Sequence, residues 1–225
     1  MPADVHPSPR VAMRRVDDGL ASRRIGPSEA RSHHRSLVLQ ALYRDRGRSR
    51  ADLSRELGLS RVTISEVVGD LLEDDLVVEL GTRADSRPGK PATMLDINRQ
   101  GHNIIGLDLS NSGSFAGVVT DLDGAVVARA EVDIPPALGN DGVLAAENLL
   151  QDLVALASRP VLGAGVGTPG IVDDRGVVVS APNLGWRDLP LQERLAAASG
   201  LPVSVANDAN AAVVGERSFG QGRPD

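Results

Sequence analysis

Asp208 lies between Asn207 and Asn210, directly after the short run VSVA at 203–206. A carboxylate held by amides at the end of a strand can act as a general base toward a sugar hydroxyl, and it can equally hold a ligand through hydrogen bonds alone. Asn and Asp are also preferred helix N-caps, and the residues that follow, ANAAVVGE, favour a helix. The sequence therefore leaves catalysis, ligand binding and helix capping open at this position.

A second group of polar side chains, Ser60, Arg61, Thr63 and Ser65, lies at the start of an expected helix. A DNA-recognition helix presents such N-terminal, outward side chains to the major groove. An arginine donates two parallel hydrogen bonds to O6 and N7 of guanine, whereas hydroxyls suit phosphates or base edges. The group predicts contact with double-stranded operator DNA, without indicating which member reads a base.

Three basic residues, Arg83, Arg87 and Lys90, lie in the Gly- and Pro-rich segment GTRADSRPGKP. Basic side chains stiffened by prolines suit the DNA backbone or a narrow minor groove. The alternative is a solvated surface loop. Because the segment separates two strand-like runs, LVVEL and ATMLDI, we expect it to connect the strands of a β-hairpin.

Two short helices must position the hydroxyls and the arginine at 60–65. Ser49 is suited to cap the first helix, which buries Leu53 and Leu57 and ends at Gly58. Ser60 is suited to cap the second. The residues expected to face inward from the second helix are Ile64, Val67, Val68, Leu71 and Leu72. Two helices joined by Gly-Leu-Ser are typical of a helix-turn-helix.

A winged helix-turn-helix is therefore predicted at residues 31–98, with a further helix between His33 and Gly47 and the hairpin as its wing. Any three short amphipathic helices would give a similar pattern. Residues 1–30 are rich in Pro, Ser, Arg and Asp and lack a sustained apolar period, so we expect a disordered tail there.

Composition narrows the class of protein. The chain has 225 residues and no cysteine, and it contains no apolar run near the roughly 18 residues that span a bilayer. It also lacks the apolar N-terminal segment of a signal peptide. These features predict a cytoplasmic protein with no membrane partner. Residues 1–100 carry 17 basic and 15 acidic side chains and residues 101–225 carry 7 and 15, which suggests two modules with different partners.

From residue 102 the pattern becomes that of an α/β domain, 102–225. NIIGLDLS predicts a strand, and FAGVVTDLDGAVVARAEVDI predicts two strands around an Asp-Leu-Asp-Gly hairpin followed by a third. A helix is expected at 141–158, and another in PLQERLAAASG. Strands are expected in VLGAGVGTPGIVD and LPVSVAND, with a last helix in ANAAVVGERSFG.

In GLDLSNSGS, DLDGAVV, GVGTPGIVD, APNLGW and LPVSVANDANAAVVGE the sequence resembles the ROK family of sugar kinases and sugar-responsive repressors. The preceding helices resemble the DNA-binding part of the repressor branch. The resemblance implies an actin- and sugar-kinase-like (ribonuclease H-like) fold. In that family an Asp-x-Gly-Gly-Thr loop holds ATP phosphates. Here Asp108 is kept, but Ser110 and Asn111 replace the glycines, which predicts a structural hairpin that no longer holds ATP. A serine/asparagine turn that still binds an anion is the alternative.

The same resemblance implies sugar-binding roles for Asn183, Asn207 and Asp208, with Asp208 a vestigial general base, and it places Thr168 of the TPG loop in the same pocket. Ala206 stands where the family usually has Glu. Capping of the last helix is the alternative for Asn207 and Asp208.

The sequence ends soon after Glu216. In the family, the zinc-binding His/Cys cluster, the second phosphate loop and much of the dimerising half lie further along. We therefore expect only the first lobe here, apparently truncated, with no cofactor and no catalytic residue. The predicted function is a repressor of carbohydrate metabolism that binds operator DNA and a sugar or sugar phosphate, and that is a homo-oligomer where the full domain is present. A ROK carbohydrate kinase and a DNA-binding fragment without ligand response are the alternatives.

Overall fold

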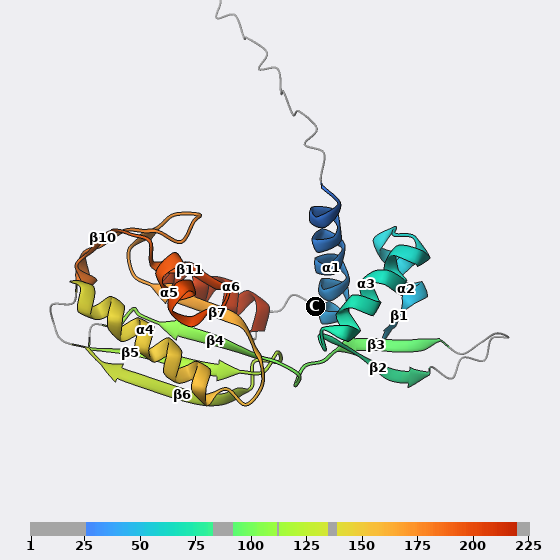
Figure 1. Cartoon of the computed structure of the whole chain (residues 1–225), viewed down its shortest axis with the longest axis horizontal. Coiled ribbons are helices and arrows are strands. Elements are labelled where there is room, and N and C mark those ends of the chain that lie inside the picture. Colours follow the sequence, from blue (N-terminus) through green and yellow to red (C-terminus); the bar gives the residue numbers. More distant parts are fainter. Residues whose placement is uncertain (1–25, 83–91, 112, 135–138, 220–225) are drawn as a thin grey trace, which may run out of the picture.

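The computed structural model of the chain describes residues 26–82, 92–111, 113–134 and 139–219. Its helices and strands form two groups, each with its own buried apolar core (Figure 1). The core of the first group lies among residues 38–97, and the core of the second among residues 105–205.

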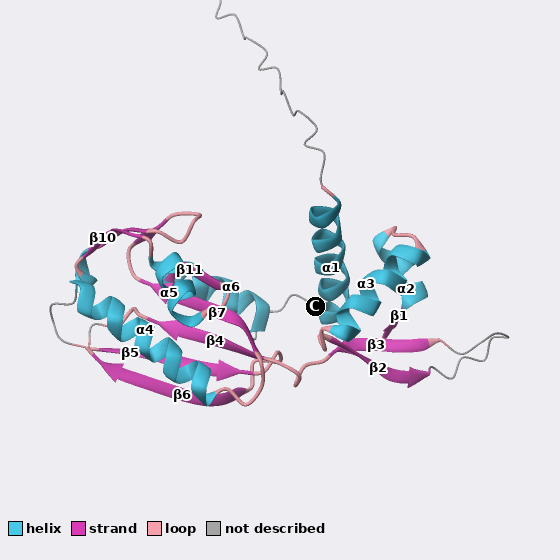
Figure 2. Cartoon of the chain, viewed as in Figure 1, coloured by secondary structure: helices cyan, strands magenta, loops and turns pink. Residues whose placement is uncertain are grey.

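The first group is a bundle of three helices beside a small antiparallel sheet (Figure 2). Its elements are α1 (Pro27–Arg44), β1 (Arg48–Ser49), α2 (Arg50–Leu57), α3 (Arg61–Glu73), β2 (Val77–Thr82) and β3 (Thr93–Ile97). The strand order is β1-β3-β2, so the two-residue strand β1, which the sequence did not predict, extends the expected hairpin. From α3, Ile64, Val67, Val68 and Leu71 are buried, as predicted.

Local capping determines where α2 and α3 begin. The hydroxyl of Ser49 accepts a hydrogen bond from the backbone N–H of Asp52 at 3.2 Å, and the hydroxyl of Ser60 accepts from the N–H of Thr63 at 3.1 Å. Gly58 ends α2 in the left-handed conformation, with φ of 66°. These three predictions from the sequence are confirmed.

Helix α1 begins earlier than the sequence suggested. It starts at Pro27, inside the segment predicted to be a tail, and it ends at Arg44 rather than at Gly47. Proline fits the first turn of a helix because its missing N–H would have no partner there. The carboxylate of Glu29 accepts from the backbone N–H of Gly26 at 3.1 Å, which satisfies another of the free donors of that turn.

The second group is built on a five-stranded sheet with the order β11-β7-β4-β5-β6. The strands are β4 (Asn103–Asp108), β5 (Ser114–Thr120), β6 (Val126–Asp133), β7 (Val161–Thr168) and β11 (Val203–Asn207). Strands β4, β7 and β11 run parallel, whereas β5 and β6 are antiparallel to their neighbours. Helices α4 (Gly139–Leu156) and α5 (Leu191–Ser199) cover one face, and α6 (Asp208–Phe219) lies over β7 and β11 on the other (Figure 1).

The sequence prediction was wrong about one strand and missed a second sheet. The expected third strand after the Asp-Leu-Asp-Gly hairpin does not exist, because β6 continues unbroken to Asp133 with alternating exposure. The sheet that was missed has the order β10-β9-β8 and consists of β8 (Ile171–Val172), β9 (Val178–Ala181) and β10 (Trp186–Leu189), with the 3-10 helix η1 (Pro182–Leu184) between the last two. Trp186 anchors it by donating to the carbonyl of Gly139 at 2.7 Å.

The turn between β5 and β6 contacts the first group. The backbone N–H of Leu122 donates to the carbonyl of Arg99 at 3.1 Å, and the Leu122 side chain packs against the first core. Asp123 forms ion pairs with Arg99 at 2.8 Å and with Arg46 at 3.3 Å. The Arg99 guanidinium also lies 5.2 Å from the centre of the Tyr43 ring. We call this set of contacts the turn–linker joint.

No helix in the described ranges combines the length and the apolar character that crossing a bilayer requires.

Candidate functional site

Among the described arginines of the first group, Arg61 is the one whose guanidinium has no carboxylate partner. It is exposed at the N-terminus of α3, and no carboxylate of the described residues lies within 4.0 Å of it. Every other arginine described between residues 26 and 99 has a carboxylate within that distance. A guanidinium without an internal partner keeps its donors available for phosphate or for a base edge.

The hydroxyls predicted beside Arg61 differ in availability. Those of Ser60 and Thr63 lie 2.9 Å apart and hydrogen-bond each other, and Ser60 also caps α3. Ser65 is exposed one turn further along. The structure therefore places Arg61 and Ser65 on one outward ridge, four residues apart, and gives Ser60 a structural task in addition to any contact with DNA.

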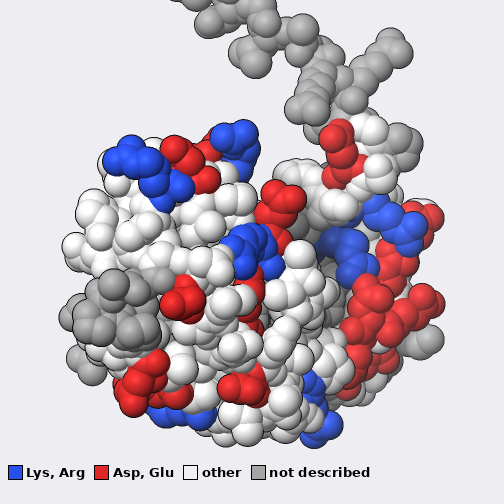
Figure 3. All heavy atoms as spheres, turned by 60° about the vertical axis from the view of Figure 1, so that its left-hand side comes forward, with Lys and Arg blue, Asp and Glu red and all other residues white. Residues whose placement is uncertain are grey.

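Acidic residues limit which part of α3 can approach DNA. Glu66 and Glu73 are exposed, and Asp70 accepts two hydrogen bonds from Arg31, at 2.6 and 2.8 Å. On the face drawn in Figure 3, acidic side chains gather along the right-hand edge, and the described basic residues form no continuous patch there. Because phosphates repel carboxylates, the N-terminal turn of α3 is its only part suited to a phosphate backbone.

The three basic residues predicted for the hairpin, Arg83, Arg87 and Lys90, lie outside the described residues.

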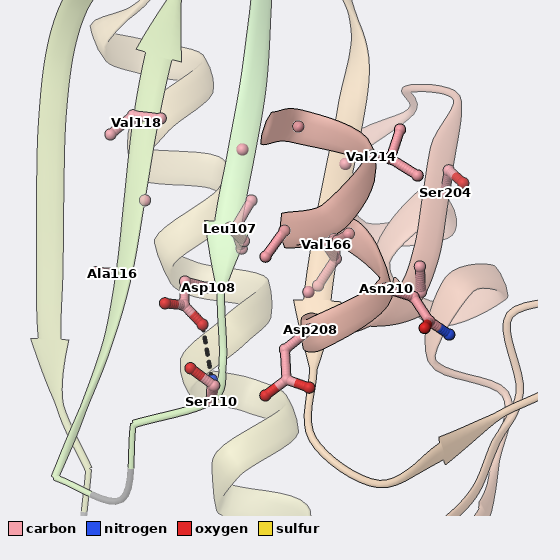
Figure 4. Close-up of a pocket in the computed structure, with 18 of the residues that line it drawn as sticks. Leu107, Asp108, Ser110, Ala116, Val118, Val166, Ser204, Asp208, Asn210 and Val214 are labelled. Atoms are coloured by element: carbon pink, nitrogen blue, oxygen red, sulfur yellow. Dashed lines mark hydrogen bonds between the residues drawn. The ribbon is translucent and has the colours of Figure 1, made fainter. Parts of the chain in front are cut away.

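A groove of about 1020 Å³ lies between the open face of the large sheet and α6 (Figure 4). Small residues form its floor: Gly106, Ala116, Gly165, Gly167 and Ala206. Asp108, Ser110 and Asp208 lie together at one end of it, where β4 and β11 finish. The carboxyl ends of parallel strands in α/β sheets are the usual place for ligands.

The two polar groups of the Asn207 side chain are already used within the protein. Its amide nitrogen donates to the carbonyl of Gly170 at 3.0 Å, and its amide oxygen accepts from the backbone N–H of Asn210 at 3.1 Å. The second bond is the N-cap that the sequence left open as an alternative. Asp208 accepts from the N–H of Ala209 at 2.8 Å through Oδ1, and the described residues give Oδ2 no partner. Asp208 is therefore free to bind a hydroxyl, whereas Asn207 fixes the surrounding backbone.

Thr168 and Asn183 occupy different environments. Thr168, which pairs with Asn207 in the sheet, is fully buried, and its hydroxyl has no hydrogen-bond partner among the described residues. It does not line the groove. Asn183 is exposed on η1, two residues after Ala181. A Cβ on Gly170, where φ is +93°, would lie 2.9 Å from the Cα of Ala181, so glycine allows the loop after β7 to approach this segment.

Two backbone donors of the loop after β4 are used within the loop itself. The N–H of Ser110 donates to Asp108 at 2.9 Å, and the N–H of Gly113 donates to the side chain of Asn111 at 3.2 Å. Ser114 in turn donates to Glu131 at 2.5 Å. A phosphate-binding loop needs free N–H groups pointing at the anion. This loop instead uses two of its donors internally and has carboxylates at both ends.

The described residues contain no group of three or more His, Asp or Glu arranged to hold a metal ion.

A sheet of this order, with a groove at the carboxyl ends of its parallel strands, is that of a sugar-kinase-like α/β domain. The model of the ROK family matches residues 104–223, more than half of the sequence, so the chain belongs to the ROK family.

Three relatives illustrate its position in that family. The xylose repressor of Bacillus spizizenii (strain ATCC 23059 / NRRL B-14472 / W23) is 29% identical over 194 residues, which cover 83% of this chain and 49% of the repressor. The glucokinase of Streptomyces coelicolor is 38% identical over 122 residues, 53% of this chain and 37% of the kinase. The crystal structure of a ROK family transcriptional regulator, a homolog of the E. coli MLC protein, matches 84% of this chain and 49% of its own, with a TM-score of 0.73 and 26% identity. The chain thus spans about half the length of the repressors and the regulator.

One position that the sequence analysis did not select is Val62, which is 68% exposed beside Arg61. An apolar residue within a helical segment gives no polar signal, so only its exposure distinguishes it.

Proposed function

We propose that the chain is a DNA-binding transcriptional regulator, a repressor of carbohydrate metabolism, whose ROK-type module binds a sugar or sugar phosphate. The observation that carries the proposal is the extent of the similarity. The xylose repressor and the ROK regulator match 83 and 84% of the chain, whereas the glucokinase matches 53%. Only the regulators among these three share sequence with both groups of elements.

The first module, residues 31–98 together with the start of α1, is proposed to be a winged helix-turn-helix. Two capped helices joined through Gly58, followed by an antiparallel hairpin, have the element order of that fold. In this proposal Arg61 and Ser65 enter the major groove, and Ser60 and Thr63 lie near the phosphates. The wing residues Arg83, Arg87 and Lys90 contact the DNA beside them.

The second module, residues 102–225, is proposed to hold the sugar. Asp208 accepts hydrogen bonds from sugar hydroxyls through its free oxygen, and Asn183 approaches from η1. Asn207 acts by positioning, because both ends of its amide are engaged. Thr168 supports the strand end from inside the core.

We propose binding without phosphoryl transfer. Phosphoryl transfer depends on donors and cations that stabilise the transferred group. The loop after β4 uses two of its backbone donors internally, and the hydroxyl of Ser114 at its end donates to Glu131. Few donors of this loop are therefore left to stabilise a transferred phosphoryl group.

Operator DNA and a sugar effector are the proposed partners in the cytoplasm. A two-fold dimer would read two half-sites, and a ligand that favours one spacing of the DNA-binding modules over another would change operator affinity.

DNA selection from a random duplex pool tests the first half of the proposal. The chain should enrich a sequence motif and bind it with an affinity that falls as salt rises. Arg61→Ala should weaken binding to the selected duplex by about tenfold or more. Arg187→Ala is the matched control, since Arg187 is an exposed arginine of the second module. Equal losses in the two variants would contradict the assignment of Arg61.

Calorimetry with pentoses, hexoses and their phosphates tests the second half. Heat of binding should appear with one of them and be lost in Asp208→Asn, and a coupled assay should show no ATP turnover. A turnover above about 1 s⁻¹ would identify a kinase instead. No heat with any sugar would identify a DNA-binding chain without ligand response.

A further inference from the structure

Val62 is an exposed apolar side chain on the helix that is proposed to enter DNA. In the described part of the first module, only Val62 and Leu80 are large apolar residues with exposed side chains, at 68 and 59%. Folding does not explain Val62. It contributes nothing to the buried core of that module, and a β-branched residue is a weaker helix former than alanine or a charged residue.

Its neighbours define what can approach it. Val62 lies between Ser60, which caps α3, and Thr63, whose hydroxyl is bonded to that cap. The free guanidinium of Arg61 is adjacent in the chain. Ser65 and Glu66 follow three and four residues later on the same exposed ridge. The methyl groups of Val62 are therefore the apolar part of an otherwise polar surface that faces away from the core.

In the major groove of DNA, the thymine C5-methyl group is the apolar feature among hydrogen-bonding base edges. An arginine that reads guanine and an adjacent valine that contacts a thymine methyl would read neighbouring base pairs.

We propose that Val62 is a specificity residue that reads a thymine through contact between its methyl groups and the thymine C5-methyl group. This inference rests on the proposed DNA-binding function and adds the base that the helix selects.

The test uses the full chain and the duplex selected from a random pool. Each thymine of that duplex is replaced in turn by deoxyuridine, which removes only the C5-methyl group, and affinity is measured by fluorescence anisotropy. At one thymine in each half-site the substitution should weaken binding by about fourfold, the factor expected for withdrawing one methyl group from an apolar contact. The other thymines should tolerate it.

Val62→Ala is then measured on both duplexes. It should bind the thymine duplex about as weakly as the wild-type chain binds the deoxyuridine duplex, and it should no longer distinguish the two. Val213→Ala is the control, because Val213 is 69% exposed on α6 of the second module, and it should keep the wild-type ratio. Both positions are exposed, so neither substitution removes core packing.

Two results distinguish a failure of the proposed DNA-binding function from a failure of the role of Val62. If no motif is enriched and binding responds to salt alone, the DNA-reading function itself is wrong, and this inference falls with it. If a motif is enriched, but Val62→Ala keeps the full preference for thymine over deoxyuridine, the regulator stands and the role of Val62 is refuted.

Discussion

Ser60 caps α3 and is proposed to lie near DNA, and two substitutions separate these roles. Ser60→Ala removes the bond to the N–H of Thr63, at 3.1 Å, and the bond between the two hydroxyls, at 2.9 Å. Loss of an N-cap costs about 1 kcal/mol, within a range of about 0.5–2. For a domain of about 60–100 residues, which is the size of the first module, a loss of 1 kcal/mol lowers its Tm by about 4–8 °C.

Ser60→Asp keeps the cap, because Asp and Ser are comparable N-caps, and its charge interacts favourably with the helix dipole, by about 0.3–1 kcal/mol. The variant should therefore unfold at the wild-type temperature or slightly above it. Its carboxylate would face the phosphates, so its DNA affinity should fall further than that of Ser60→Ala. Stability and affinity are expected to move in opposite directions between the two variants.

Differential scanning fluorimetry and anisotropy on the selected duplex measure the two quantities. Ser49 provides the control, since its hydroxyl caps α2 in the same way but is 5% exposed and unavailable to DNA. Ser49→Ala should lower Tm without a selective loss of DNA affinity at a temperature where the protein is folded. An aspartate at 60 that leaves DNA affinity unchanged would refute the proposed orientation of α3.

Three further predictions concern the second module. Gly170→Ala should destabilise the protein by at least about 2 kcal/mol in urea, because φ is +93° and the new Cβ would lie 2.1 Å from the carbonyl oxygen of Ser180. Gly165→Ala meets nothing within 4 Å and should be tolerated; equal losses would refute the argument. Thr168→Val should raise stability by about 1 kcal/mol and leave sugar binding intact, since the buried hydroxyl has no partner among the described residues; lost binding would instead show a sugar contact. The backbone N–H of Val177, and then the hydrogen bonds from Arg175, lower the pKa of Asp173. The ionised Asp173 carboxylate therefore stabilises the folded protein fully above the ordinary carboxyl pKa, and this contribution is lost as pH falls through the lowered value. The urea midpoints of wild type and Asp173→Asn should differ at neutral pH and begin to converge only as pH falls below about 4, the ordinary carboxyl value, and a constant gap would contradict this.

Much of the fold could be predicted because its signals are local. Ser49, Gly58 and Ser60 specify helix ends through bonds within a few residues, and such signals are visible in the sequence. The small sheet β10-β9-β8 was missed because its strands have two to four residues, too few for a period to show. Its formation depends on contacts distant in sequence, including the bond from Trp186 to Gly139.

The candidate site could be predicted by residue type but not by orientation. Asn207 and Asp208 are adjacent polar residues in the sequence. The amide of Asn207 caps α6 and donates to the carbonyl of Gly170, whereas Asp208 keeps one carboxylate oxygen without a partner among the described residues. From the sequence, Thr168 was expected to contact the sugar as Asn207 and Asp208 do. In the structure its position in the sheet directs its side chain into the buried core. Side-chain direction depends on that register, which one sequence does not reveal.

The turn–linker joint restrains the movement of the two modules relative to each other. The segment between them is bonded at both sides: Asn98 donates to Asp75 at 2.8 Å, and the carbonyl of Arg99 accepts from Leu122. A side chain on Gly101 would lie 2.3 Å from the Asn98 amide, so the bend is tightly filled. These contacts therefore connect the two modules rigidly and not through a flexible linker. While they hold, a rotation of the large sheet also displaces α3, and the displacement of α3 increases with its distance from the turn between β5 and β6.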